Sequence, residues 1–580
     1  MLPLGTLRAR SAFVRIAAGA LTAALCAGAS LAQVPPGAVP PPDAKSPERA
    51  PLPEQKPRAV DPDFRLPPLP PLRDDRLSSA LRVLVKRFAF SGNTVFGDEE
   101  LRALIKEYEG RTLGNVEIED ARARLTDHYI KNGYINSGAL LPDQDVAEGV
   151  LTFQIVEGRL SEVTIGGTNR FNPGFLRDRA TADPAAPLKL PVLQERLQLL
   201  AQNPLIERLT AELGPGERLG EARLKLDVTE APPHDIGYRF SNTRSPSIGS
   251  YLHEARASAR NLLGRGIALG LRAGRTRGLD EYTVALAAPV TAQDTVLSVR
   301  YDKNRALVIE QPFAPLDIVS RSDTLEVGLT HPIYRKLDQE WNLGAYYSER
   351  ESETFLLGEP FSFLPGIADA RSVVKAVRIS LEWFHRSEAQ VLSARAWFKH
   401  GLHVSGATIR PNLPDSLFMT RFVQFQWVRR LSEAANQIVF RYDRQFANGS
   451  LLPSEKFALG GMESVRGYRE NRLVKDQGWF ASFEYRHPVA RWVPGGISTR
   501  SEDGVIQLVA FADAGRAYDD RELVVTTDRL SSFGAGVRWD VVSGIYARLY
   551  YAKAQRRIRM PDPDPQDRGL HFLINMSRAF

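Results

Sequence analysis

The carboxyl-terminal part of this chain, from about Pro232 onward, alternates apolar and polar residues at a period of two over roughly 350 residues. The stretches LSVRYD at 297–302, LEVGL at 325–329 and WFASFEYR at 479–486 show the pattern most clearly. A period of two indicates β-strands with one apolar and one polar face, because successive side chains of a strand point to opposite sides. This part of the chain is therefore predicted to be all-β and antiparallel.

Two antiparallel architectures fit the pattern, a soluble sandwich with its apolar faces inside and a membrane barrel with its apolar face outside. The polar face here is rich in charged residues and glycine, as a water-filled lumen requires, and the region is very large for one sandwich. At about 22 residues for each strand and its connection, the region holds about 16 strands, an even number within the range of known barrels. We therefore predict a transmembrane antiparallel β-barrel over residues 232–580.

The chain ends inside such a strand. In GLHFLINMSRAF, the apolar residues Leu570, Phe572, Ile574 and Met576 recur at every second position, and the last residue is Phe580. An ordinary final strand has the same alternation, but a terminal aromatic residue resembles the signal by which bacterial outer-membrane barrels are recognised for assembly. The barrel-assembly machinery is therefore an expected partner during biogenesis.

Residues 1–32 have the order of a secretory signal peptide, with three arginines, a small apolar run at 16–29 and the tripeptide SLA before Gln33. A membrane anchor is the alternative, although the run is short and rich in alanine for a span. The one cysteine, Cys26, lies inside this segment, so the mature chain is expected to contain no disulfide. Removing the three arginines lowers the formal net charge from +7 to +4, which is too little to indicate a nucleic-acid partner.

Residues 33–80 differ in composition from the rest of the chain. Between Gln33 and Leu72, 14 of the 40 residues are proline, which blocks the hydrogen bonding of both helix and sheet. This stretch is predicted to be an extended periplasmic linker, with a proline-rich binding motif for a partner as the alternative.

Between the linker and the barrel, a β-α-α-β-β pattern occurs over residues 81–158 and again, in weaker form, over residues 159–231. In the first copy, apolar residues recur at helical spacing in DEELRALIKEYEG and in VEIEDARARLTDHYIKNGY. In the second copy, PVLQERLQLLAQN has the same spacing. Two successive α+β modules are the simplest interpretation.

Six short motifs occur in the order and at the spacing of a known family. The first module contains FSGNT, NGYINSGALLPDQ and GVLTFQIVEG, the start of the barrel contains NLLGRG, and its later part contains FALGGMESVRGYRE and FADAG. From Leu81 to its end, the chain resembles the outer-membrane transporters of two-partner secretion, which export haemolysins and filamentous adhesins. The resemblance implies that the two modules are periplasmic POTRA domains, POTRA 1 at 81–158 and POTRA 2 at 159–231.

The candidate functional site joins the loop motif VRGY to the strand motif FADAG. An arginine offers a fixed fork of five donors, whose natural mate is a carboxylate, and Gly467 is expected to allow a tight turn beside Arg466. Asp513 must face either lipid or the lumen, because side chains of a barrel strand alternate between the two sides. A carboxylate facing lipid would be costly, so we expect Asp513 to face the lumen. The resemblance implies that the loop at 457–478 folds into the barrel and that its arginine meets this aspartate; a solvated surface loop is the alternative. The candidate residues are Val465, Arg466, Gly467 and Tyr468 in the loop, and Phe511, Asp513 and Gly515 in the strand.

Client binding is predicted at one sheet edge of each module. In modules of this order the strand after the second helix normally lies at the edge, where unpaired backbone groups can accept an extended client strand. The predicted edges are INSGALL in the first module and IERLTAEL in the second; packing against each other or against the barrel is the alternative. The candidate residues are Ile135, Ser137 and Ala139 in the first edge, and Ile206, Arg208 and Thr210 in the second.

The sequence predicts a pore for a protein client rather than an enzyme. It contains no G-x-S-x-G, H-E-x-x-H or G-x-x-x-x-G-K motif, and we expect neither a cofactor nor a metal site. The resemblance implies a monomer, surrounded by outer-membrane lipid, that moves a large unfolded β-rich exoprotein of haemolysin or adhesin type to the cell surface. The alternative is a barrel-assembly factor of the same superfamily, although two modules rather than three or five favour export.

Overall fold

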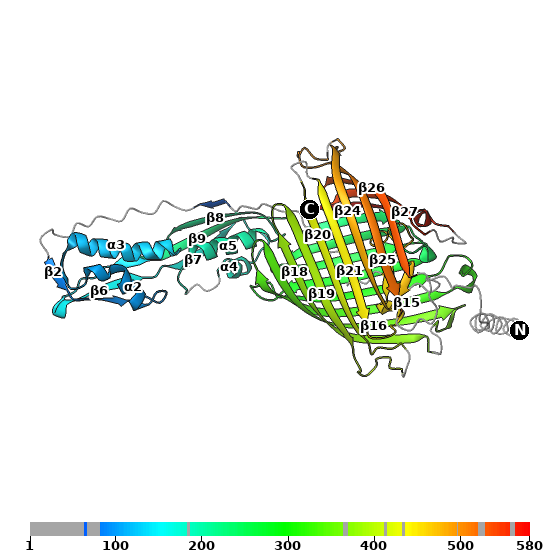
Figure 1. The fold of residues 1–580 in the computed structure, drawn as a ribbon, viewed down its shortest axis with the longest axis horizontal. Coiled ribbons are helices and arrows are strands. Elements are labelled where there is room, and N and C mark those ends of the chain that lie inside the picture. The colour runs from blue at the N-terminus through cyan, green and yellow to red at the C-terminus, as the bar shows by residue number, and fades with distance from the viewer. Residues whose placement is uncertain are drawn as a thin grey trace, which may run out of the picture.

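The structure, a computed structural model, describes residues 63–65, 82–181, 186–363, 369–410, 414–431, 436–495, 497–519, 528–556 and 563–580. The predicted signal peptide lies outside these ranges, and so does the predicted linker except for residues 63–65. Figure 1 shows two small modules in a row, extending from one end of a large barrel.

The first module is a small α+β unit. Its sheet has the order β3-β6-β5, in which β3 runs parallel and β5 antiparallel to β6, while β2 and β4 form a separate pair. The expected first strand is therefore split at Lys86, and a short strand lies between the two helices. The elements are β2 (Arg82–Val85), β3 (Arg87–Ser91), α2 (Asp98–Ile105), η2 (Lys106–Tyr108), β4 (Arg111–Gly114), α3 (Asn115–Lys131), β5 (Gly138–Leu140), η3 (Ala147–Gly149) and β6 (Val150–Val156).

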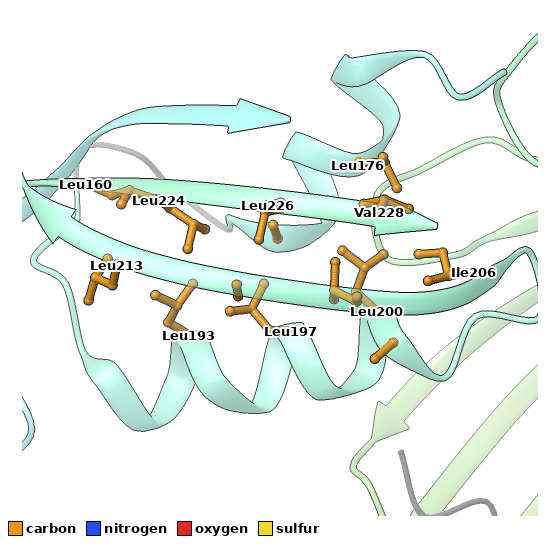
Figure 2. Close-up of a cluster of buried hydrophobic side chains, with 14 of the residues drawn as sticks. Leu160, Leu176, Leu193, Leu197, Leu200, Ile206, Leu213, Leu224, Leu226 and Val228 are labelled. Atoms are coloured by element: carbon orange, nitrogen blue, oxygen red, sulfur yellow. The ribbon is translucent and has the colours of Figure 1, made fainter. Parts of the chain in front are cut away.

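The second module repeats this plan with longer strands. Its own strands have the order β8-β9-β7, and both helices share one buried core with the sheet. Figure 2 shows Leu193, Leu197 and Leu200 of the second helix directed at the sheet, where they join Leu224 and Leu226 in one buried core. The elements are β7 (Arg159–Gly166), α4 (Pro173–Ala180), α5 (Leu190–Ala201), β8 (Ile206–Pro215) and β9 (Glu221–Glu230).

In each module, a half-buried glutamate at or just after the end of the last strand binds the segment that follows the first strand. Glu157 accepts hydrogen bonds from the backbone N–H groups of Thr94 and Val95 at 2.7 and 2.8 Å. Glu230 accepts three from residues 169–171 at 2.8–3.0 Å, plus one from the Arg170 side chain. Burial alone would raise the pKa of each carboxyl, but the hydrogen bonds outweigh it and hold the pKa below its ordinary value.

The second module is fastened to the barrel through the NLLGRG turn and through the connection at residues 290–295. The N–H of Asn172 donates to the carbonyl of Gly264 at 2.9 Å, and Arg179 forms an ion pair of 2.7 Å with Asp294. A Cβ on Gly264 would lie 2.4 Å from the carbonyl oxygen of Arg170, and its φ is +69°. Only glycine fits this close approach, which explains why the turn motif has a glycine there.

The barrel is a closed antiparallel sheet, as predicted, with sixteen strands among the described residues besides the two-residue β17 (Glu359–Pro360). Its strands are β10 (His234–Ser241), β11 (Leu252–Leu262), β12 (Ile267–Arg275), β13 (Leu279–Pro289), β14 (Val296–Leu307), β15 (Val319–Arg335), β16 (Gln339–Leu356), β18 (Arg371–Arg386), β19 (Gln390–Gly401), β20 (Met419–Arg430), β21 (Gln437–Ala447), β24 (Gln477–Arg491), β25 (Val505–Tyr518), β26 (Arg529–Val542), β27 (Ile545–Ala554) and β28 (Leu570–Ala579).

The last strand closes the barrel against the first. β28 pairs with β10 from Asp235 opposite Ala579 to Ser241 opposite Leu573. The carboxyl-terminal Phe580 continues the pairing, because its N–H donates to the carbonyl of His234 at 2.9 Å. The aromatic terminus is therefore part of the seam that closes the barrel.

The two faces of the barrel strands differ as the alternation predicts. In β25, Leu508 is 49% exposed on the outside, whereas Asp513 on the other face is 2% exposed. The outer apolar residues give the barrel the apolar surface that contact with lipid requires. No helix within the described ranges has the length and apolarity needed to cross a bilayer.

Candidate functional site

The connection between β21 and β24 turns back into the barrel instead of extending away from it. It contains the turn η6 (Pro453–Glu455) and a hairpin of β22 (Phe457–Leu459) and β23 (Leu473–Lys475), and we call residues 457–475 the latch. Val465 and Tyr468 at its tip are buried with Phe422, Phe480 and Leu530 of the barrel wall. The latch therefore packs on the wall through an apolar cluster as well as through charges.

Arg466 lies against the aspartate of the FADAG strand. Its Nε and Nη2 donate to the two carboxylate oxygens of Asp513, both at 2.9 Å, and its backbone N–H donates to the same carboxylate at 3.1 Å. Both side chains are at most 2% exposed. Because the paired fork geometry fixes both position and orientation, this contact holds the loop in one register against β25.

A second carboxylate completes the surroundings of Arg466. Nη1 donates to Glu484 of β24 at 2.6 Å, and Nη2 donates to the Ser482 hydroxyl at 3.1 Å. Glu484 in turn accepts from Arg486 at 2.6 Å. Sequence reasoning placed Ser482 and Glu484 on the polar face of their strand but did not connect them to Arg466, because that requires the register in which Ser482 lies opposite Asp513.

Aromatic rings cover the same guanidinium. Its Cζ lies 3.4 Å from the ring centre of Phe511 and 5.1 Å from that of Tyr550. The rings exclude water from the ion pairs and add a cation–π attraction. Removing one partner from so buried a network costs about 3–5 kcal/mol, because the remaining charges stay buried without compensation.

The tight turn expected beside Arg466 is present, because the N–H of Tyr468 donates to the carbonyl of Val465 at 3.2 Å. The φ of Gly467 is not in the left-handed region, so the turn alone does not require a glycine, and the close packing does. A Cβ there would lie 2.5 Å from the Cβ of Ser532 and 2.9 Å from the backbone nitrogen of Ala554. Gly515 likewise leaves room for Leu459 of the latch. A Cβ added to Gly515 would lie 2.7 Å from Cδ1 of Leu459. Both glycines allow the latch and the wall to approach closely.

Further ion pairs hold other parts of the same connection. Arg469 contacts Asp567 at 2.5 Å and Glu310 at 2.6 Å, both in connections at the end of the barrel away from the modules. Glu455, just before the latch, accepts from Lys399 of β19 at 2.8 Å. The connection is thus held at several places around the barrel.

The first predicted client edge is shorter than expected. Only Gly138–Leu140 forms a strand, because a turn bond from the N–H of Ser137 to the carbonyl of Tyr134 precedes it. Ile135 packs on the core of the second module, the Ser137 hydroxyl accepts from the N–H of Gly158 at 2.9 Å, and Ala139 is buried. The three candidate side chains therefore serve the first module and its junction with the second.

The second predicted edge is a full strand. β8 has ten residues; the Ile206 side chain is buried in the module core, Arg208 is exposed and Thr210 is half-buried. The short strand β1 (Asp63–Arg65), from the proline-rich segment, pairs parallel with its middle. The prediction that this segment forms no sheet is wrong at these residues, because Asp63–Leu66 contains no proline.

Within the ranges that the structure describes, no group of three or more His, Cys, Asp or Glu residues is placed to hold a metal ion. The site described above consists of ion pairs, aromatic rings and tightly packed glycines. Such an arrangement holds two pieces of chain together.

The comparisons with known proteins agree on one family. The family described as haemolysin secretion/activation protein ShlB/FhaC/HecB matches residues 220–539, and the POTRA domain of ShlB type matches residues 83–158. The chain is 22% identical to the outer membrane transporter CdiB of Dickeya dadantii (strain 3937) over 486 residues, which is 81% of this chain and 83% of that protein.

Two further relatives give the same picture. The chain is 20% identical to the heme/hemopexin transporter protein HuxB of Haemophilus influenzae over 401 residues, 67% of this chain and 69% of that protein. The solved structure of CdiB from Escherichia coli has a TM-score of 0.63 at 19% identity and covers 90% of this chain and 94% of its own. This last likeness concerns the fold.

Proposed function

Because the chain belongs to the haemolysin secretion/activation protein family ShlB/FhaC/HecB, we propose that it secretes one large, unfolded, β-rich exoprotein of haemolysin or adhesin type. As a two-partner secretion transporter it is an outer-membrane protein that exports an exoprotein, with its amino-terminal modules in the periplasm. The closed barrel with an in-folded latch, fastened to modules with a strand-accepting edge, carries the proposal.

The barrel works as a monomer surrounded by lipid. Its outer residues, such as Leu508, are apolar and exposed, as a lipid-facing surface requires. No nucleotide is available in the periplasm, so folding of the exoprotein outside the cell supplies the drive for transport.

The exoprotein binds first along β8. This strand is the longest at the edge of either module, and its backbone can add a strand of client by hydrogen bonds that need no particular client sequence. The first module offers only the three residues of β5 at its corresponding edge. We therefore place client recognition on the second module.

The latch stays in place during transport. Arg466 makes five hydrogen bonds to buried groups of the wall, and further ion pairs hold Arg469 and Glu455. Breaking all of them at each transport event would leave several buried charges without partners, which is strongly unfavourable. In this proposal the latch shapes the lumen and does not act as a gate.

Comparison of the culture medium and the outer membrane of a deletion strain tests the function. We expect one large secreted protein to disappear from the medium and to return when the gene is restored. A general loss of barrel proteins from the outer membrane, with the medium otherwise unchanged, would identify a barrel-assembly factor instead.

Site-specific photo-cross-linking tests β8. A photoreactive residue at Arg208 or Glu212, both with exposed side chains, is expected to cross-link to the exoprotein found in the first experiment. Val192, 45% exposed on α5, is the matched control and is expected to give no cross-link. Absence of cross-links at both β8 positions, with secretion intact, contradicts client binding at this edge.

A further inference from the structure

The outer face of the barrel carries a row of arginines at the end away from the modules, which is the extracellular end. Pairing places Arg444 of β21 opposite Trp479 of β24, Trp479 opposite Arg516 of β25, and Arg516 opposite Arg529 of β26. Alternation turns Arg516 outward, because Asp513, three residues before it, faces the lumen. Figure 1 shows these four strands side by side on one flank of the barrel. We call the four residues the arginine row.

The arginine row lies at the extracellular border of the apolar band. From Ile506 to Ala514, every outward residue of β25 is apolar, and Arg516 is the next outward residue. Ten residues of a strand span about 33 Å, which is about 25 Å along the axis of a barrel whose strands tilt by about 40°. This is the height of the apolar band of an outer-membrane barrel. Arg516 therefore lies at the level of the lipid headgroups.

Positive charge is in excess around the arginine row. No aspartate or glutamate occupies an outward position within β20, β21, β24, β25, β26 or β27 as bounded above. In the part of the chain that the structure describes, the three arginines of the row form one ion pair, between Arg516 and Asp528 at 2.6 Å. Like charges directly opposite each other on neighbouring strands are destabilising. An anion beside Arg516 and Arg529 would remove this repulsion.

Aromatic rings hold two of the guanidinium groups close together. Nη2 of Arg444 donates to the hydroxyl of Tyr518 at 3.3 Å, and Cζ of Arg516 lies 5.0 Å from the ring centre of Tyr518. Arg444 also lies over the ring of Phe446, with 4.5 Å between its Cζ and the ring centre. Its Nε is buried and has no hydrogen-bond acceptor among the described residues. Two cations thus share one neutral tyrosine, and a donor is left for a ligand.

The flank formed by β14, β15, β16 and β18 has basic residues at the same end, but they lie beside acids. Lys303 lies opposite Asp323, and their side chains form an ion pair of 3.7 Å. Arg321 and Arg371 both lie opposite Glu353, on either side of it. This flank therefore neutralises its own charges, and the excess of positive charge is a property of the flank with the arginine row.

We propose that the arginine row binds the phosphorylated headgroup of a glycolipid in the outer leaflet of the outer membrane. The arginine fork makes paired hydrogen bonds with phosphate oxygens, and clusters of basic residues beside a membrane bind anionic headgroups. The indole of Trp479, between two of the arginines, suits the same interface. The acyl chains lie against the apolar band below. This inference goes beyond the proposed function and does not depend on the exoprotein.

Titration of the purified full-length transporter with diphosphoryl lipid A tests the site, with the bound lipid counted by native mass spectrometry. R444Q/R516Q/R529Q is expected to bind this lipid at least tenfold more weakly than the wild type. The matched control K303Q/R321Q/R371Q removes three positive charges from the self-neutralised flank and is expected to bind as the wild type does. Equal affinity of R444Q/R516Q/R529Q and the wild type contradicts the proposal, and so does an equal loss in both triple variants.

A second comparison uses the wild type alone, so it does not depend on the folding of a variant. Lipid A from which both phosphates have been removed is expected to bind at least tenfold more weakly than the diphosphoryl form. Equal affinity for the two lipids overturns the proposal. Inorganic phosphate at the concentration of the lipid is expected to leave the bound lipid in place. Displacement of the lipid by inorganic phosphate would identify a site for free phosphate and contradict a lipid site.

Discussion

The latch and the outer edge of β8 are both places where one part of the chain lies against another, but they are held in opposite ways. The latch is held by buried charge: Arg466 binds Asp513 and Glu484 beneath the rings of Phe511 and Tyr550. The β8 edge is covered by three backbone pairs with a strand that prolines prevent from growing. The first contact is costly to break, whereas the second consists of short backbone pairing alone.

This difference separates a contact made by buried charges from one made by backbone pairing. When a buried ion pair is broken, the remaining charge stays buried without a partner or water. States in which the latch is only partly detached are therefore strongly disfavoured. Backbone pairing at a sheet edge involves no such charge, and an edge can accept a further strand by backbone hydrogen bonds. We therefore expect mutations at the latch to act on the folded barrel and mutations at the edge to act on client loading.

The largest effect is expected from R466M. It leaves Asp513 and Glu484 buried without their main partner, which costs about 3–5 kcal/mol, and we expect secretion to be lost. R466K, which keeps the charge but not the fork, is expected to lie between R466M and the wild type. Two measurements compare R466M and R466K with the wild type. The first is the amount of secreted protein per transporter in the outer membrane, and the second is the temperature at which the barrel unfolds on a gel.

The control for this series is R275A, whose side chain is 79% exposed and paired only at the surface. A surface pair contributes about 0–1 kcal/mol, so secretion should be unchanged. Equal behaviour of R466M and R275A would show that the latch arginine is not structurally important.

The two carboxylates of the latch site should differ in their coupling to Arg466. Asp513 receives three hydrogen bonds from this residue and Glu484 receives one. Double-mutant cycles of R466M with D513N and with E484Q, measured by thermal unfolding, should give the larger coupling free energy for Asp513. A simple exchange of charge between 466 and 513 is unsuitable, because an acid at 466 would face Glu484.

A smaller effect is expected from G467A. The added Cβ would lie within 3 Å of Ser532 and of the backbone of Ala554, and overpacking of this kind costs about 1–3 kcal/mol. We expect a lower unfolding temperature and reduced secretion. G449A, in the same connection but with nothing within 4 Å of the added Cβ, should behave as the wild type. If G467A does too, the latch does not pack closely on β26 and β27.

In the modules, Glu230 gives a test by pH. The pKa of its carboxyl lies below the ordinary value of 4.5. Its contribution to the free energy of unfolding is therefore complete above pH 4.5 and is lost as the pH falls through the lowered pKa. E230Q should destabilise the second module by about 2 kcal/mol at neutral pH and remove this part of the acid sensitivity. The destabilisation is measured by hydrogen exchange of residues 169–171 in the whole transporter. The control is E217Q, which changes an exposed glutamate.

Much of the fold is predictable from the sequence because alternation, turns and helical spacing are local signals. The lumen-facing phase of Asp513 follows from the cost of placing a carboxylate in lipid. The role of Glu484 does not, because it depends on the register between β24 and β25, which no local pattern fixes. Composition also concealed β1: prolines dominate its segment, and only the pairing with β8 distinguishes residues 63–65 from their neighbours.

Hydrogen exchange with mass spectrometry on the full-length transporter in lipid nanodiscs tests the contrast most directly. The measurement is made with and without a purified amino-terminal fragment of the exoprotein that disappears from the medium of the deletion strain. On adding the fragment, residues 206–215 should gain protection, and residues 464–468 of the latch should not change. Loss of protection at 464–468 without a gain at 206–215 would contradict the account.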